Sequence, residues 1–225
     1  MLILQVAPEI ISDAVEQPAM NLWTMALYGG PIMIVLALML AFAVYLFIER
    51  LVTLKQASKE DKTFMNRIKD YIYDGKIESA IKLCRETNTP SARMIEKGIS
   101  RLGRPLNDVL VAIENVGNLE IANLEKGLVI MASISGGAPM LGFLGTVTGM
   151  VSTFYNMSIN NSGMIQMSDL SSGMYQAMVT TIGGLIVGIL AYFAYNYLVS
   201  RVDSVVRNLE SKTMEFMDIL NEPAK

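Results

Sequence analysis

Threonine hydroxyls are the groups best placed to do chemistry in the most apolar part of this chain, which runs from residue 127 to residue 199. This stretch contains no Lys or Arg and a single acid, Asp169. Thr146 and Thr153 are seven residues apart and so share one helical face, while Thr181 shares a face with Gly184 and Gly188. These faces are candidate walls of an ion path. The alternative is that each hydroxyl bonds to the carbonyl one turn before it, which requires no ion path.

Composition excludes several other kinds of site. The chain has no His and a single cysteine, Cys84. It therefore lacks the residues for a disulfide framework, for a zinc site rich in His and Cys, and for Ser-His-Asp or Cys-His catalysis. We expect no catalytic residues, no metal site and no cofactor.

Small residues recur at helical spacing beside the threonines. Gly142, Gly145 and Gly149 do so in one segment, and Gly184 and Gly188 in the next. Small residues at this spacing let helix backbones approach closely in a membrane. We therefore expect both segments to pack against other helices.

Three apolar segments must position these residues. Residues 127–157 and 173–200 are each long enough as helices to exceed a hydrocarbon core of roughly 30 Å, and a polar break at 158–172 separates them. A first span is expected over residues 22–49, with Trp23 and Tyr28 at one interface and Glu49-Arg50 at the other. The predicted fold class is an all-α membrane protein with three transmembrane helices and a helical cytoplasmic domain, its second and third membrane helices extending into the cytoplasm.

The distribution of basic residues predicts the topology. Residues 1–49 contain no Lys or Arg, whereas residues 50–126 hold 14 of the chain's 18 basic residues. By the positive-inside rule, residues 50–126 and 201–225 are cytoplasmic, and residues 1–21 and 158–172 lie outside. Residues 1–21 are expected to form an amphipathic helix at the outer interface, with a disordered tail as the alternative.

The charged segment 50–126 is predicted to form helices separated by Gly and Pro. Short helices are expected to end at Gly75, near Pro90 and at Gly103, and one long helix from Asn107 is expected to run directly into the second span. The tail after Arg201 keeps an apolar stripe and is expected to pack against the cytoplasmic helices. Acids match bases almost one for one, so we expect no nucleic-acid binding.

Two segments resemble a known family. The segment Ala138–Met150, APMLGFLGTVTGM, resembles the signature of the MotA/TolQ/ExbB family of proton-channel proteins, and the segment Gln176–Ala191, QAMVTTIGGLIVGILA, resembles that family's third transmembrane helix. ExbB is the branch it resembles most. The resemblance implies that Thr146 and Thr181 line a central pore.

The chain departs from the family pattern at two positions. Gln176 stands where many ExbB and TolQ proteins carry a glutamate, and Leu190 stands where a proline is usual. The first departure removes the one titratable group expected within the span. A proton carrier must then come from another chain, because ionisable groups inside the membrane are the usual carriers.

The resemblance also implies partners and a place of action. The chain would form a pentamer in the bacterial inner membrane around an ExbD-like protein, whose single span supplies a proton-carrying Asp. This motor would act through a TonB-like protein on outer-membrane transport. TolQ-like, gliding and flagellar stator roles stay open within the family, as does the choice of proton or sodium.

A small-solute transporter and a structural scaffold are the alternatives to a motor subunit. An autonomous small-solute transporter should show internal repeats and a polar site at the midplane, and three spans without a repeat argue against it. A structural membrane scaffold would tolerate valine at Thr146 and Thr181, whereas a motor subunit would not.

Overall fold

The computed structural model describes residues 29–58, 63–159 and 167–221. These residues form helices and their connections. The helices are α2 (Gly30–Ala57), α3 (Phe64–Tyr73), α4 (Ile77–Thr87), α5 (Pro90–Ile99), α6 (Leu106–Glu125), α7 (Leu128–Ile159) and α8 (Met167–Asn221). The segment 1–21, the expected anchors Trp23 and Tyr28, and residues 160–166 of the polar break lie outside the described residues.

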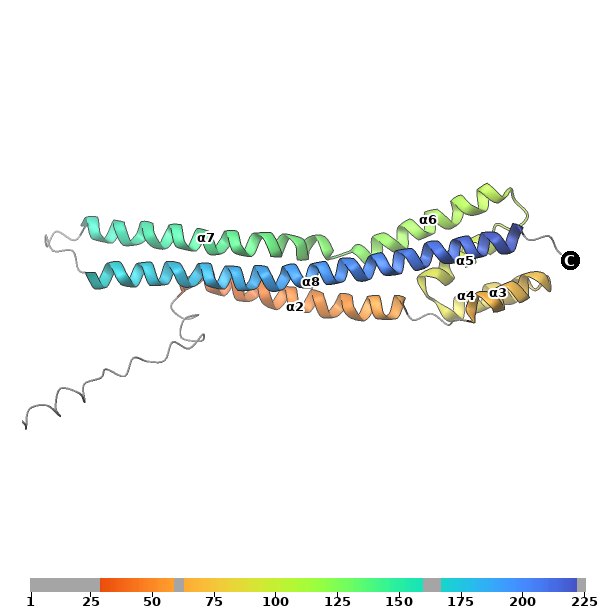
Figure 1. Ribbon diagram of the computed structural model, residues 1–225, viewed down its shortest axis with the longest axis horizontal. Helices are drawn as coiled ribbons and strands as arrows, with labels where there is room; N and C mark the ends of the chain where they lie inside the picture. Colours follow the sequence, from red (N-terminus) through yellow and green to blue (C-terminus); the bar gives the residue numbers. More distant parts are fainter. Residues whose placement is uncertain (1–28, 59–62, 160–166, 222–225) are drawn as a thin grey trace, which may run out of the picture.

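Helix α8 is the axis of the molecule. Its 55 residues form one uninterrupted helix of about 80 Å. Helices α7 and α6 follow one another along α8, α2 packs against both α7 and α8, and α3 to α5 gather around the C-terminal half of α8 (Figure 1). One helix therefore joins the apolar bundle to the charged helices.

The apolar bundle has the properties of a membrane domain. Three helical stretches, in α2, in α6–α7 and in α8, are long and apolar enough to cross a membrane. Large apolar side chains such as Leu38, Phe143 and Phe193 are about two-thirds exposed on this bundle. Lipid can cover such side chains at no cost. The prediction of an all-α membrane protein with three spans is thus confirmed.

The charged helices pack around an interior of their own. Phe64 of α3, Ile113 of α6 and Phe216 of α8 are fully buried there. On α5, Thr89 caps the N-terminus by accepting a hydrogen bond from the backbone N–H of Ala92 at 3.3 Å, and Pro90 occupies the first turn. Burial of large apolar side chains from distant segments explains why the tail of α8 joins this group.

The long helix expected from Asn107 into the second span is interrupted. Helix α6 ends at Glu125, Gly127 adopts a φ of 87°, and α7 begins at Leu128. The guanidinium of Arg50 lies at this break, where its Nη1 donates to the Asn123 carbonyl at 3.1 Å. The last carbonyls of a helix lack intrahelical donors and attract cations, so Arg50 ties α2 to the break.

The other helix bounds also differ from the expected ones. Helix α2 begins at Gly30 and continues past Arg50 to Ala57, α7 extends to Ile159, and α8 begins at Met167. The predicted break 158–172 therefore includes helical residues at both of its ends. Helix α7 continues through Pro139, whose ring packs against Gly188 of α8.

Candidate functional site

Helices α7 and α8 approach each other through the five predicted glycines. A Cβ built on Gly184 would lie 2.6 Å from the Ala138 carbonyl oxygen and 2.8 Å from the Gly142 Cα. A Cβ on Gly188 would lie 2.5 Å from the Pro139 Cγ, and one on Gly149 would lie 3.2 Å from the Ala177 Cβ. We call this contact, formed by Gly142, Gly145, Gly149, Gly184 and Gly188, the glycine interface.

The threonine hydroxyls at the glycine interface bond to the backbone in two ways. The Oγ1 of Thr146 donates to the Phe143 carbonyl at 2.6 Å, and that of Thr153 donates to the Gly149 carbonyl at 2.9 Å. The Oγ1 of Thr181 instead crosses to α7 and donates to the Gly142 carbonyl at 3.2 Å. Local back-bonding therefore describes Thr146 and Thr153 but not Thr181.

Each of these hydroxyls keeps the capacity to accept a hydrogen bond. A threonine hydroxyl has one donor and two lone pairs, and the donor is already used by a backbone carbonyl. Thr146 and Thr181 are half-buried, so another molecule can still reach them. An incoming carboxylic acid or water could donate to them without displacing a protein hydrogen bond.

Thr146 and Thr181 lie on the same flank of the α7–α8 pair. Helix α2 marks the opposite flank, because a Cβ on Gly183 would lie 2.9 Å from the Met33 Sδ, and one on Gly137 would lie 3.9 Å from the Met39 Cε. Thr181 is two residues from Gly183, or about 200° around α8, and Thr146 is nine from Gly137, or about 180° around α7. Both threonines are therefore turned away from α2.

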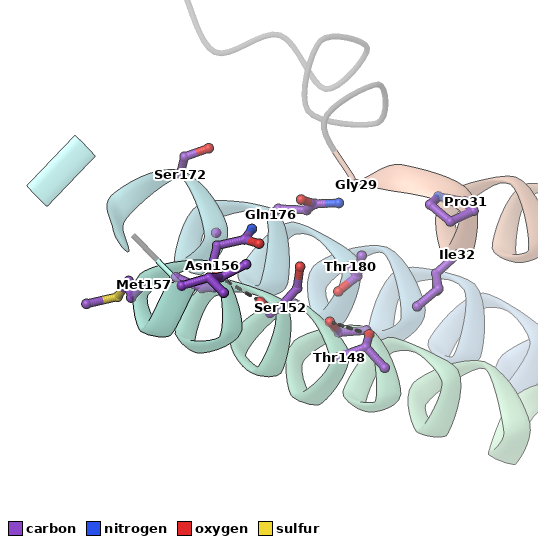
Figure 2. Close-up of a pocket in the computed structure, with 15 residues that line it drawn as sticks. Gly29, Pro31, Ile32, Thr148, Ser152, Asn156, Met157, Ser172, Gln176 and Thr180 are labelled. Carbon is purple, nitrogen blue, oxygen red and sulfur yellow. Dashed lines mark hydrogen bonds between the residues drawn. The ribbon is translucent and has the colours of Figure 1, made fainter. Parts of the chain in front are cut away.

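A polar cavity of about 700 Å³ occupies the α2 flank near the far end of the bundle. Figure 2 shows Thr148, Ser152 and Asn156 of α7 near Gln176 and Thr180 of α8, with the start of α2 beside them. The residues that line the cavity include no acidic or basic side chain. The cavity can hold water or another uncharged polar group, but its own residues cannot bind or release a proton near neutral pH.

Gln176 lies in this cavity, next to the start of α2. A Cβ on Gly30 would lie 2.6 Å from the Gln176 Nε2, and Gly30 has a φ of 68°. Both the space and the backbone conformation therefore favour glycine at the start of α2. The departure noted in the sequence at Gln176 thus falls in the polar cavity and not on the flank of Thr146 and Thr181.

Most of the polar cavity was not predicted from the sequence. Thr148, Ser152 and Asn156 are spaced by four residues and form a polar stripe on α7, which the sequence alone displays. Thr180, also on the cavity wall, is 2% exposed and donates to the Ala177 carbonyl at 2.7 Å.

Comparison with known proteins supports a family assignment. The model of the MotA/TolQ/ExbB proton channel family matches residues 86–211, which is more than half of the chain and includes Thr146, Thr181 and the whole glycine interface. The chain belongs to this family. It is a multi-pass membrane protein related to subunits of proton channels, and its family resemblance to ExbB is confirmed.

Individual relatives carry two names within the family. The chain is 28% identical to the biopolymer transport protein ExbB of Neisseria meningitidis over 80% of its own length and 87% of the relative's. It is 25% identical to the Tol-Pal system protein TolQ of Haemophilus influenzae over 86% and 90% of the two lengths. An ExbB homolog of Methanothermobacter thermautotrophicus is 28% identical over 81% of this chain, which spans 64% of that relative.

Proposed function

We propose that this chain is an ExbB-like subunit of a motor driven by the proton-motive force in a bacterial inner membrane. The observation that carries the proposal is the placement of Thr146 and Thr181. Both lie on the flank of the α7–α8 pair that faces away from α2, in a pair of helices held together by glycines. Copies arranged in a ring with α2 outside would turn both threonines toward a common centre.

The proton carrier in this proposal belongs to an ExbD-like partner. Helix α7 and residues 170–200 of α8 contain no Asp, Glu, Lys, Arg or His. A proton that crosses between these helices must therefore be carried by water or by a group from another chain. When the partner's Asp is protonated, its hydroxyl can donate to the free lone pairs of Thr146 and Thr181.

Rotation would follow from this arrangement if the ring and the partner differ in symmetry. A pentamer around a dimer of the partner offers several equivalent threonine pairs to one acid at a time. Each protonation and release would then favour a new position of the partner. Through a TonB-like protein, this motion would supply energy to transport across the outer membrane.

A TolQ-like role in the same type of motor is the second candidate. The similarity to the Haemophilus TolQ covers nearly all of that relative, which supports this second candidate. Their difference lies in the partner, ExbD-like or TolR-like. A structural scaffold without an ion path is the candidate of a different class.

Co-purification followed by reconstitution tests the proposal. The chain is purified in mild detergent from its own cells, the single-span protein that accompanies it is identified, and both are placed in liposomes with a pH gradient. Proton flux should require both chains and the partner's membrane Asp. The chain alone should leak little, because its spans carry no titratable carrier. Rapid dissipation by the chain alone would refute the assignment of the carrier to the partner.

A further inference from the structure

A second cavity lies between the end of α2 and the middle of α8. It has a volume of about 730 Å³, and its lining includes Lys55 and Ser58 from α2 and the turn after it, and Tyr197, Arg201 and Ser204 from α8. Gln56 and several apolar side chains, Val52 among them, complete the wall. We call it the basic cavity. It lies on the opposite side of the membrane domain from the polar cavity of Figure 2.

The two cations of the basic cavity have no acidic partner among the residues that the structure describes. Arg201 is held in place by Tyr197, whose hydroxyl oxygen accepts from Nε at 3.0 Å and from Nη2 at 2.9 Å. Lys55 forms no ion pair in the described part of the chain. By contrast, Arg93 binds Glu120 through two hydrogen bonds, and Arg85 binds Glu96.

The position of the cavity along the helices places it at the membrane surface. In α2, residues 31–48 carry no charge, and Lys55 lies seven residues beyond Ile48, or about 10 Å. In α8, Arg201 is the first charged residue after the apolar run 170–200. Both cations therefore fall in the layer of lipid headgroups, where long basic side chains place their charges.

Exposed apolar surface continues from the cavity along α2 toward the membrane centre. Val52, Ile48 and Tyr45 are each about half or more exposed. A ligand that places an anionic group between Lys55 and Arg201 could also cover this surface with hydrocarbon. A soluble anion would leave the surface uncovered, so the arrangement favours a lipid.

We propose that the basic cavity binds the phosphate group of an anionic phospholipid from the adjacent leaflet. The planar guanidinium of Arg201 can give two parallel hydrogen bonds to phosphate oxygens, and Lys55 supplies a second charge from the facing helix. The hydroxyls of Ser58 and Ser204 provide further donors. One acyl chain then lies along Val52 and Ile48, so that the lipid joins α2 to α8 at this end of the bundle.

Lipid titration of the full-length chain tests the proposal. The protein in neutral detergent is titrated with phosphatidylglycerol, and bound lipid is counted by native mass spectrometry. Phosphatidylcholine with the same acyl chains and inorganic phosphate are the comparison ligands. We expect phosphatidylglycerol to bind at least about tenfold more tightly than phosphatidylcholine, and millimolar inorganic phosphate not to displace it.

A double variant and a matched control locate the site. K55Q/R201Q should weaken phosphatidylglycerol binding at least about tenfold. K82Q/R104Q, which removes the same charge from exposed positions on α4 and in the turn before α6, should change it less than about twofold. All four positions are exposed or half-exposed, so elution as the same oligomer is expected. Equal weakening by both variants, equal binding of phosphatidylcholine, or displacement by inorganic phosphate would each overturn the proposal.

Acidic side chains of the chain itself are the remaining candidates to bind the two cations of the basic cavity in place of a lipid. Glu60 and Asp61 follow Ser58 in the sequence and lie outside the described residues. If the lipid is the occupant, E60Q/D61N should leave its affinity within about twofold. A tenfold gain of affinity would mean that these acids occupy the cavity in the intact chain, and would overturn the proposal.

Discussion

At the scale of single residues, Thr181 makes a shorter hydrogen bond to the Gly142 carbonyl than its neighbour Thr180, whose Oγ1 lies 3.5 Å from the same oxygen. The Thr181 hydroxyl reaches the Gly142 carbonyl across the helix interface at 3.2 Å, whereas Thr146 and Thr153 bond within their own helix. Thr181→Val keeps the shape and removes a hydrogen bond with a net value of about 0.5 to 1.5 kcal/mol. Oligomer elution should be unchanged, and partner-dependent proton flux should fall by far more than this stability loss explains.

The control variant for Thr181→Val must lie on the flank of the α7–α8 pair that faces α2. Thr180 is unsuitable, because it is buried against Gly145 and its substitution would disturb packing. Thr148 is exposed, bonds back to the Leu144 carbonyl at 2.9 Å and faces the polar cavity on the α2 side. Thr148→Val should retain most of the flux. Equal losses in both variants would contradict the assignment of the pore flank.

Cys84 allows a second prediction at this scale. Its thiol is fully buried in α4, and burial raises its pKa to about 12. Only the thiolate reacts readily with maleimides, so the folded protein at pH 8 should label at a small fraction of the rate of a free cysteine. Denaturation in detergent should restore full labelling, and Cys84→Ser should abolish it. Rapid labelling of the folded chain would show that α4 opens frequently.

At the scale of elements, the glycine interface determines how closely α7 and α8 pack. Gly184→Ala places a methyl group 2.6 Å from a backbone oxygen, which cannot move away as a flexible side chain could. Overpacking of this kind costs about 1 to 3 kcal/mol. We expect a lower thermal unfolding midpoint and partial loss of the oligomer, measured by scanning fluorimetry and size-exclusion chromatography.

Gly136, in the neighbouring helix α7, provides a matched control. A Cβ there would meet no atom within 4 Å, so Gly136→Ala adds a methyl group without a clash. Alanine also favours a helix over glycine by about 1 kcal/mol. The variant should therefore be as stable as the parent or slightly more so. If Gly184→Ala were equally stable, the close approach of α7 and α8 would not matter to the fold.

The break between α6 and α7 could not be predicted from the periodicity of apolar residues. Apolar residues continue at helical spacing on both sides of Lys126-Gly127, so periodicity predicts one helix. The interruption depends on the positive φ of Gly127 and on Arg50, which is distant in the sequence and bonds to Asn123. A contact between such distant residues is not visible in a local pattern.

At the scale of the whole molecule, the membrane spans could be predicted from the sequence, but the face that each span turns toward its neighbours could not. Length and missing charge identify three membrane helices, and the spacing of small residues predicts that two of them pack closely against other helices, but not that they pack against each other. The shared flank of Thr146 and Thr181 depends on where α2 packs, which Met33 and Met39 determine through contacts with Gly183 and Gly137. The polar cavity likewise needs side chains from three helices and could not be assembled from one segment.

The shape of the molecule leads to a final prediction about its orientation. The end of α2, the break after α6 and the charged part of α8 lie on the same side of the apolar bundle as α3 to α5, which places most basic residues on one side (Figure 1). Basic residues near spans are retained in the cytoplasm. Single cysteines introduced at Ser58 and Ser162 should therefore label from opposite sides in intact cells, with only the second accessible to an impermeant maleimide. The buried thiol of Cys84 should contribute little background, so the parent sequence can be used. Labelling of Ser58→Cys from outside, in cells that exclude the reagent from a cytoplasmic control protein, would reverse the topology and place the basic cavity in the outer leaflet.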